Sequence, residues 1–295
     1  MPSEIQASET TDGERTGGTL DVALIQTRTP ADPVAAFEHV KPLILQAAAT
    51  EAHLILLPEC ANLMEARREQ KALVVTTEAR DVFIKGVREM ARDMRVHILI
   101  GSAIIKSEID ERAVNRTLLV NAHGDIVARY DKVHLFDADT PDGKAYRESA
   151  SVKPGEEAVV AKTPWGGLGL SVCYDVRFAY LYRMLAKAGA NMIAVPAAFT
   201  VPTGKAHWEV MLRARAIETG AIVLAPAQGG PHEDGRVTYG HSLVVNPWGE
   251  VIARLDHDSP AVLQATLDFS EVTRARRALP QLQHDRPIEL HVSVK

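Results

Sequence analysis

Short apolar runs of β type alternate with amphipathic stretches of helical length from Asp21 onward, and this alternation restricts the fold more than any other feature. The runs DVALIQT, HLILLPE and VHILIGSAII are separated by VAAFEHVKPLILQAAATEA and TEARDVFIKGVREMARDM, in which apolar residues recur at helical spacing. Strands that alternate with helices predict one layered α/β domain and not separate helical and β domains.

Three hairpin signals add antiparallel pairing to this pattern. Alternating runs flank the turn sequences Asn-Ala-His-Gly-Asp at 121–125, Pro-Trp-Gly-Gly at 164–167 and Asn-Pro-Trp-Gly at 246–249. We therefore expect mixed sheets with helices on their faces. No Pro/Ser-rich linker or repeat interrupts the chain between residues 19 and 280, so we predict a single domain over 19–287. A polar, disordered tail over 1–18 and a C-terminal tail over 288–295 would flank it.

Composition excludes several classes of protein. The net charge of −5 gives no basic surface for nucleic acid, and no segment has the roughly 20 apolar residues that cross a bilayer. Two cysteines among 295 residues cannot form a disulfide framework. The first residues do not resemble a secretion signal, so we expect a soluble cytoplasmic protein with reduced thiols.

Three polar residues each follow an apolar run. Glu59 follows HLILLP, Lys132 lies in RYDKVHLFD, and Cys173 follows GLSV. Taken singly, they are typical of a solvated loop carboxylate, a surface lysine and a cysteine that fills a core. Together they include what a thiol nucleophile needs, a base to accept its proton and a positive charge to lower its pKa.

The strings LLPE, YDKVHLFD and SVCYDVRF, in this order and spacing, resemble the nitrilase superfamily of carbon-nitrogen hydrolases, and the likeness extends from Asp21 to about Pro287. The resemblance implies an α-β-β-α sandwich of two mixed sheets flanked by helices. It also implies a catalytic triad without a cofactor. Glu59 would be the base and Cys173 the nucleophile that forms a thioester, while Lys132 and the backbone N–H of Tyr174 would stabilise the oxyanion.

The residues around Cys173 indicate which branch of the superfamily the chain resembles. Cys173 is followed by Tyr-Asp, as in amidases, and not by the Trp-Glu of true nitrilases. The blocks AHWEVMLRARAIETGAIVLAPAQGG and YGHSLVVNPWGEV resemble the Nit branch, which contains omega-amidases and deaminated glutathione amidases; the sequence from Ala227 to His232 favours the latter. We therefore expect hydrolysis of a small linear amide to a carboxylate and ammonia. The chain departs from the family at Ala179-Tyr180, usually Pro-Glu, and at Lys205, often Pro.

Three alternatives to this activity remain. The protein could be an omega-amidase acting on α-ketoglutaramate, or a hydrolase of N-carbamoyl amides. It could also be a binding or regulatory module that keeps the fold and uses the pocket for recognition only. The intact set of Glu, Lys and Cys argues against a binding module, since recognition alone does not require a thiol.

Several other residues are candidates for the site. Glu148 matches a second glutamate of the family and could orient Lys132 or the substrate amide, or be an ordinary loop carboxylate. Arg177 could pair with a substrate carboxylate, with Arg213 and Arg215 as further candidates, or form an ion pair with Asp175 or Glu209. His207 and Trp208, at the expected start of a helix, could line the pocket or pack in the core.

The remaining features concern metals and assembly. The histidines show no H-E-x-x-H pattern or paired cysteine spacing, so we expect no metal site. In FAYLYRMLAKAG, over 178–189, large apolar residues occupy more than one helical face, which predicts burial against a partner surface. Together with the family resemblance, this predicts a homodimer built on that helix.

Overall fold

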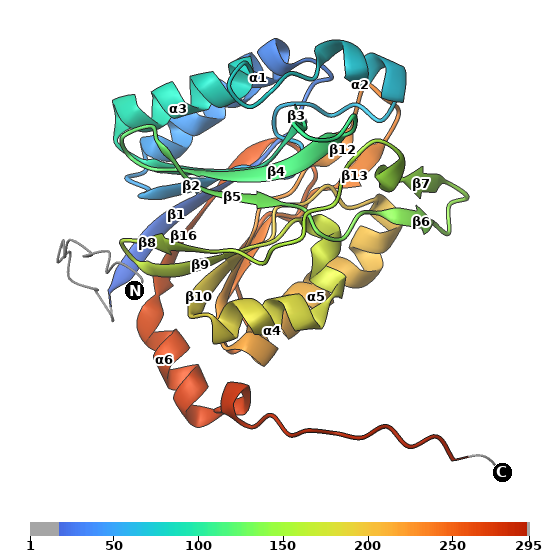
Figure 1. Ribbon diagram of the computed structural model, residues 1–295. Coiled ribbons are helices and arrows are strands. Elements are labelled where there is room, and N and C mark those ends of the chain that lie inside the picture. The colour runs from blue at the N-terminus through green and yellow to red at the C-terminus, as the bar shows by residue number, and fades with distance from the viewer. Residues whose placement is uncertain (1–17, 294–295) are drawn as a thin grey trace, which may run out of the picture.

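The computed structural model describes residues 18–293, which form two six-stranded sheets lying face to face (Figure 1). The first sheet has the order β16-β1-β2-β3-β4-β5, with parallel pairing among β1, β2 and β3 and antiparallel pairing elsewhere. Its strands are β1 (Thr19–Gln26), β2 (Leu54–Leu56), β3 (His97–Lys106), β4 (Ala113–Val120), β5 (Ile126–Asp131) and β16 (Ala261–Asp268).

The second sheet repeats this arrangement. Its order is β15-β14-β11-β10-β9-β8, again with three parallel strands, β9, β10 and β11, flanked by antiparallel ones. The predicted mixed sheets are thus confirmed. The strands are β8 (Val160–Thr163), β9 (Gly166–Leu170), β10 (Ala190–Ala194), β11 (Ile222–Ala225), β14 (Leu243–Val245) and β15 (Val251–Arg254), and two small hairpins pair β6 (Asp137–Asp139) with β7 (Ala145–Arg147) and β12 (Gly229–Pro231) with β13 (Val237–Tyr239).

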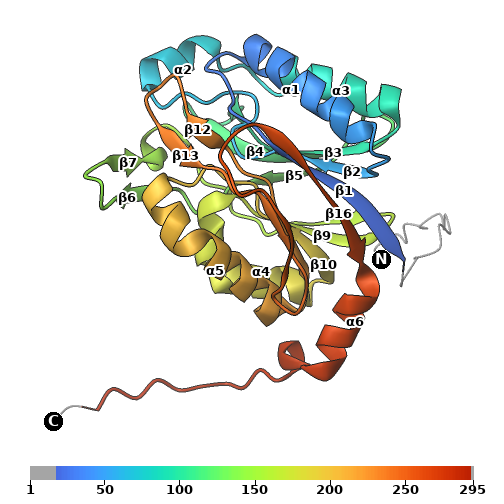
Figure 2. The ribbon, with the colours of Figure 1, turned by 180° about the vertical axis from the view of Figure 1, so that it is seen from behind.

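Helices cover the outer faces of both sheets and complete the predicted α-β-β-α sandwich (Figures 1 and 2). The first sheet is covered by α1 (Pro33–Ala48) and α3 (Val82–Met94), and the second by α4 (Ala179–Lys187) and α5 (Val201–Thr219). The other helical elements are α2 (Arg68–Val74), α6 (Phe269–Ala278) and the 3₁₀ turns η1 (Glu148–Ala150), η2 (Cys173–Arg177) and η3 (Gln281–Gln283).

The side chains of β1 show why the apolar runs are continuous. Val22 and Leu24 are buried in the core shared with the second sheet, whereas Ala23 and Ile25 are buried against the helices of the first layer. Successive side chains of a strand point to opposite faces, and here both faces are covered. The run from Val22 to Ile25 is therefore apolar on both faces of the strand.

The three predicted hairpins are confirmed, and the boundary of one predicted helix was wrong. β4 pairs with β5, β8 with β9 and β14 with β15, each antiparallel. The helical pattern from Thr77 extended too far toward the N-terminus, because α3 begins only at Val82. The Asp81 carboxylate accepts a hydrogen bond from the backbone N–H of Ile84 and caps the helix there.

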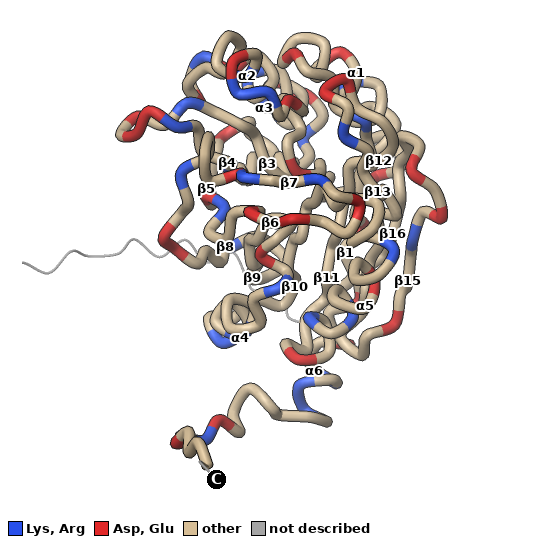
Figure 3. Tube along the Cα trace, turned by 90° about the vertical axis from the view of Figure 1, so that its right-hand side faces the viewer, with Lys and Arg blue, Asp and Glu red and all other residues tan. Residues whose placement is uncertain are grey.

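The predicted tails and the surface complete the description. The tail expected over 1–18 lies outside the described residues except for Gly18, and residues 284–293 form neither helix nor strand (Figure 1). Basic and acidic residues are interspersed on the side of the molecule where β6 and β7 lie (Figure 3). Within residues 18–293, no helix has both the length and the apolar character needed to cross a membrane.

Candidate active site

The three residues singled out at strand ends meet between the sheets. Glu59 follows β2 and Lys132 follows β5 in the first sheet, whereas Cys173 follows β9 in the second. Their exposed fractions are 4%, 2% and 8% respectively. A carboxylate, an ammonium group and a thiol are therefore withdrawn from solvent together, which strengthens every electrostatic interaction among them.

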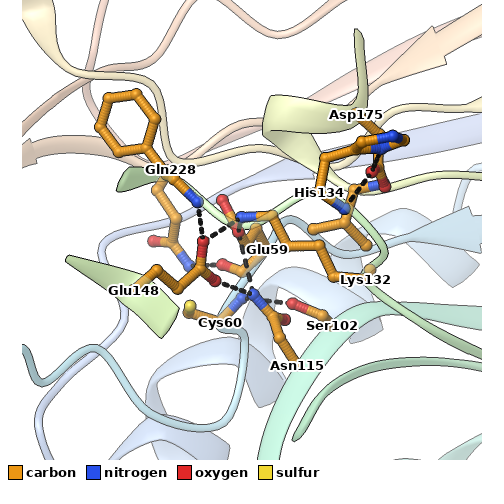
Figure 4. A network of polar contacts seen from close by, with 12 residues as sticks. Glu59, Cys60, Ser102, Asn115, Lys132, His134, Glu148, Asp175 and Gln228 are labelled. Carbon is orange, nitrogen blue, oxygen red and sulfur yellow. Dashed lines mark hydrogen bonds and ion pairs between the residues drawn. The ribbon is translucent and has the colours of Figure 1, made fainter. Parts of the chain in front are cut away.

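The Lys132 ammonium group lies between two carboxylates (Figure 4). Its Nζ is 2.8 Å from Oε1 of Glu59 and 2.8 Å from Oε2 of Glu148. Burial acts to lower the pKa of Lys132, but the charges of Glu148 and Glu59 outweigh it and raise the pKa well above its usual value. Burial likewise acts to raise the pKa of Glu148, and the ammonium group of Lys132 outweighs it and lowers that pKa. Lys132 therefore stays charged at neutral pH.

Asn115 connects the two carboxylates and was missed in the sequence. Its Nδ2 donates to Oε1 of Glu59 at 3.0 Å and to Oε1 of Glu148 at 3.2 Å. Gln228 supports the same group, because its Nε2 donates to the backbone carbonyl of Glu59 at 2.9 Å. The only available signal was a polar residue inside the apolar strand β4, and such a residue equally suits a solvent-facing position.

A left-handed turn presents Cys173. Its φ of +50° is uncommon for a residue with a side chain, and its backbone N–H donates to the carbonyl of Pro196 at 2.9 Å. The fully buried Asp175 fixes the turn: Oδ2 accepts from the backbone N–H of Val172 at 2.8 Å and from the Tyr130 hydroxyl at 2.7 Å. These contacts hold the thiol in one position despite the unfavourable backbone angle.

The protonation state of Cys173 differs from the one we expected. Burial, followed by the charge of Glu59, raises the pKa of the thiol well above its usual value, and Lys132 opposes this only in part. The prediction that Lys132 lowers the pKa of the thiol overall was wrong, because burial and the charge of Glu59 outweigh the effect of Lys132. The resting side chain is thus a thiol that needs a base at the moment of attack.

A cavity of about 240 Å³ opens beside these groups. Two of the four residues expected to bind substrate, Tyr174 and Arg177, line it. The lining also includes charged and polar residues from distant segments of the chain, together with an apolar wall. Its members include Glu59, Cys60, Lys71, Lys132, Phe136, Tyr146, Arg147, Glu148, Ser151, Cys173, Phe199, Thr200, Thr203, Arg236 and Thr238.

The other two expected residues, His207 and Trp208, do not line this cavity. We had predicted that both residues lie at the start of a helix, and this was wrong. Helix α5 already starts at Val201, so both lie inside it. Trp208 is 1% exposed and its indole N–H donates to the carbonyl of His241 at 2.8 Å, so the packing alternative fits its position. Nδ1 of His207 lies 3.3 Å from the Arg177 guanidinium group.

Arg177 makes neither of the ion pairs considered from the sequence. The Asp175 carboxylate already accepts hydrogen bonds from Val172 and Tyr130 at the turn of Cys173, and Glu209 faces Arg213 and Arg254. The guanidinium group instead lies 5.6 Å from the ring centre of Tyr174 and 5.7 Å from that of Phe199. Within residues 18–293, Arg177 has no carboxylate partner and borders the cavity.

Arg213 and Arg215 are held away from the cavity. Nε of Arg213 donates to the carbonyl of Gly249 at 2.7 Å, and Nε of Arg215 donates to that of Val176 at 2.7 Å. Both guanidinium groups thus donate to backbone carbonyls within the second layer of the sandwich. Neither residue is therefore placed to meet a substrate in the cavity.

The two departures from the family pattern differ in their relation to the site. Lys205 is exposed on α5 and does not line the cavity. The Tyr180 hydroxyl lies 2.5 Å from Nε2 of His134, whose Nδ1 is 2.6 Å from Oδ1 of Asp175. Tyr180 thus connects α4, through His134, to the carboxylate that fixes the turn of Cys173.

The site holds no arrangement suited to a metal ion. Among residues 18–293, no group of three or more His, Cys, Asp or Glu side chains is placed to coordinate one. The charges of Glu59 and Glu148 are instead balanced by Lys132. The chemistry available to the described residues is that of a thiol, two carboxylates and an ammonium group.

Comparison with known proteins agrees with this geometry. The sequence pattern of the family "Carbon-nitrogen hydrolase" matches residues 21–277. The chain belongs to the carbon-nitrogen hydrolase family. The predicted family is confirmed, as is the prediction of an enzyme that hydrolyses carbon-nitrogen bonds.

Individual relatives extend the comparison. Deaminated glutathione amidase of Yersinia enterocolitica is 45% identical over 203 residues, which are 68% of this chain and 70% of that protein. The crystal structure of the C. elegans NitFhit protein has a TM-score of 0.84 at 35% identity. The match covers 91% of this chain and 65% of the NitFhit chain. The structure of an amidase variant from Nesterenkonia sp. AN1 has a TM-score of 0.73 at 30% identity, and the match covers 88% of this chain and 94% of the amidase chain. In that structure the acetamide moiety of fluoroacetamide is added covalently at the active-site cysteine.

Proposed function

We propose that this hydrolase cleaves a linear amide whose acyl group carries a carboxylate, with deaminated glutathione as its substrate and Cys173 as its nucleophile. The observation that carries the proposal is the buried group in which Lys132 lies between Glu59 and Glu148 beside the Cys173 thiol. The name of the Yersinia enterocolitica relative supports the substrate, and the modified cysteine of the Nesterenkonia amidase supports the nucleophile.

The first half of the reaction forms a thioester. Glu59 accepts the proton of Cys173 as the sulfur attacks the amide carbon, which the raised pKa of the thiol makes necessary. The Lys132 ammonium group and the backbone N–H of Tyr174 stabilise the negative charge that develops on the carbonyl oxygen. Glu148 keeps Lys132 charged and in place. The carbon-nitrogen bond then breaks as Glu59 returns the proton to the leaving nitrogen.

The second half of the reaction restores the enzyme. Glu59 takes a proton from water, the resulting hydroxide attacks the thioester, and the carbon-sulfur bond breaks as Cys173 regains its proton. The products are a carboxylate and an amine. With a primary amide such as α-ketoglutaramate the amine is ammonia, whereas with deaminated glutathione it is the dipeptide cysteinylglycine.

Arg177 is the group that binds the acyl carboxylate of this substrate. It borders the cavity from the turn that follows Cys173, and its charge has no carboxylate partner among residues 18–293. The aromatic rings of Tyr174 and Phe199 flank the guanidinium group. Its remaining contacts are long ones to neutral partners, to Nδ1 of His207 at 3.3 Å and to Sδ of Met211 at 3.8 Å, and a carboxylate ligand would replace them with stronger charge-assisted hydrogen bonds.

Steady-state kinetics with a substrate panel tests the proposal. The purified protein should hydrolyse deaminated glutathione with a higher kcat/KM than α-ketoglutaramate, and neutral amides of similar length should be poor substrates. Cys173→Ser should lose turnover by orders of magnitude, whereas Cys60→Ser is the matched control. Preference for an N-carbamoyl amino acid or an uncharged amide would refute the substrate, and full turnover in Cys173→Ser would refute the nucleophile. A protein that binds these amides without hydrolysing them would be a binding module.

A homodimer that uses the outer face of α4 and α5 is the second part of the proposal. Leu181, Tyr182 and Leu185 of α4 are buried in the protein's own core, but Tyr180 and Met184 remain 58% and 54% exposed. The neighbouring helix α5 adds two more exposed apolar residues, Val210 and Ile217. Light scattering at micromolar concentration should give the mass of a dimer, and a monomer mass would contradict this assembly.

We also propose a cytoplasmic location. The reaction needs Cys173 as a free thiol, and both cysteines of the chain are unpaired. Reducing compartments keep thiols in that state. Fractionation of cells that express the tagged protein should find it with cytoplasmic markers, and recovery from an oxidising compartment would contradict the proposal.

A further inference from the structure

Lys71 is a further cation that borders the active-site cavity. It lies on the short helix α2, and its Nζ has one polar partner among residues 18–293, Oγ of Ser151 at 3.3 Å. No carboxylate pairs with it there. Burial is the main cause that lowers the pKa of Lys71 below its usual value. Lys71 is only partly buried, and the charges of Glu148 and Glu65 act to raise its pKa, but among residues 18–293 neither carboxylate forms an ion pair with it. Its ammonium group therefore remains available to pair with an anion that arrives from outside the protein.

Arg236 is another cationic side chain at this end of the cavity, and an ion pair with Asp234 balances its charge. It also borders the cavity, and it lies near enough to Lys71 to lower the pKa of that lysine. The Asp234 carboxylate holds Arg236 at 2.6 Å and accepts a hydrogen bond from the backbone N–H of Ala66 at 2.9 Å. The loop between β12 and β13 is thereby fastened to the segment that leads into α2. Lys71 and Arg236 consequently lie on the same side of the cavity, on segments that are hydrogen-bonded to each other.

Lys71 and Arg177 reach the cavity from opposite layers of the sandwich. Helix α2 lies on the side of the first sheet, whereas Arg177 ends the turn η2 next to α4 on the side of the second (Figure 1). Cys173 and Lys132 border the same cavity. A substrate bound across it therefore meets one unpaired cation from each layer.

We propose that Lys71, with Arg236 beside it, binds a carboxylate on the leaving group of the amide. The inference rests on the proposed function, in which Arg177 binds the carboxylate of the acyl group. The charges of Cys60 and Glu148 act on Lys71, so Lys71 lies on the side of the cavity near Glu59, which precedes Cys60 and delivers the proton to the leaving nitrogen in the proposed reaction. The preferred substrates are thus amides with one carboxylate on each side of the scissile bond. In deaminated glutathione the second carboxylate is that of glycine.

The test compares three substrates in the full-length enzyme. Deaminated glutathione carries both carboxylates. An analogue that ends in N-methylamide in place of glycine lacks only the second carboxylate, and α-ketoglutaramate keeps only the first. Lys71→Met should raise KM for deaminated glutathione by about 10- to 100-fold with little change in kcat. The same variant should leave both other substrates nearly unchanged.

Two further variants separate binding from a structural role. Lys71→Arg keeps the charge and should retain most of the affinity, and Lys85→Met removes an exposed lysine on α3 and should have no effect. An equal loss on all three substrates would make Lys71 a structural residue and overturn the inference. Unchanged KM in Lys71→Met, while the wild type still prefers deaminated glutathione, would overturn the inference alone. A wild type that hydrolyses none of the three would overturn the proposed function together with it.

Discussion

Replacement of Asn115 by alanine should slow the reaction although this side chain does not line the cavity. Asn115 is 1% exposed, and its amide group donates one hydrogen bond to Glu59 and one to Glu148. Its amide oxygen has no partner within the described part of the chain, so the orientation of the amide serves the two carboxylates. The variant removes both donors and leaves Lys132 as the remaining contact between them.

The size of the effect follows from these two contacts. A hydrogen bond to a charged group contributes about 1.5–3 kcal/mol. Since Lys132 still holds both carboxylates, we expect the variant to lose about one such contribution in the transition state. At about 1.4 kcal/mol for each tenfold change in rate, this corresponds to a fall in kcat of about 10- to 150-fold. KM should change little, because the amide group does not border the cavity.

The assay measures kcat and the free energy of unfolding on the same preparations. Asn62→Ala is the matched control, because Asn62 is fully buried and its amide group bonds to Asp81 and to the backbone of Ile104. Both variants should unfold at lower urea concentration than the wild type. Only Asn115→Ala should reduce kcat in the folded protein. Equal kcat in the two variants would show that Asn115 contributes stability alone and would refute the reasoning.

Three further predictions concern packing, charge and thiol reactivity. A Cβ at Gly101 would lie 1.8 Å from the carbonyl oxygen of Leu57 and 2.4 Å from Cβ of Pro196. In urea titrations, Gly101→Ala should therefore lower the free energy of unfolding by more than about 3 kcal/mol. Gly18→Ala, where a Cβ would meet no atom within 4 Å, should change it by less than about 0.5 kcal/mol. Since folding lowers the pKa of Glu148, its carboxylate stabilises the fold above the usual value of 4.5 and stops doing so as the pH falls through the lowered value. The difference in unfolding free energy between wild type and Glu148→Gln should therefore vanish in acid, and a difference that persists there would contradict the ion pair with Lys132. Iodoacetamide at neutral pH should label Cys173 before Cys60 in peptide mapping. Burial raises the pKa of both thiols, that of Cys60 to about 12, but only the Cys173 thiol is hydrogen-bonded to Glu59, which can accept its proton as the sulfur reacts; equal labelling would contradict this.

The sequence predicted those parts of the site that depend on local position. Glu59, Lys132 and Cys173 each follow an apolar run, and strand ends at one edge of a layered fold are close in space. The architecture was predictable for a similar reason, since alternating strands and helices leave few ways to bury every apolar face.

The parts that the sequence did not predict depend on contacts between distant segments. Lys71 and Arg236 are 165 positions apart and meet only because the loop between β12 and β13 is bonded to the segment before α2. The protonation of Cys173 also depends on the folded site, because burial and the charge of Glu59 outweigh the effect of Lys132 on the pKa of the thiol. His207 and Trp208 were placed wrongly because the predicted helix began too far along the chain. Pro202, in the first turn of α5, was the available signal of the true start.

The division of the site between two sheets has a consequence for how the protein loses activity. Glu59 and Lys132 follow strands of one sheet and Cys173 follows a strand of the other, so the groups that we propose to react lie together only while the two sheets are docked. An expanded state that retained every strand and helix would already have separated the base from the thiol. Turnover therefore reports tertiary docking, whereas far-UV circular dichroism reports secondary structure, and gentle heating should abolish the former before the latter changes.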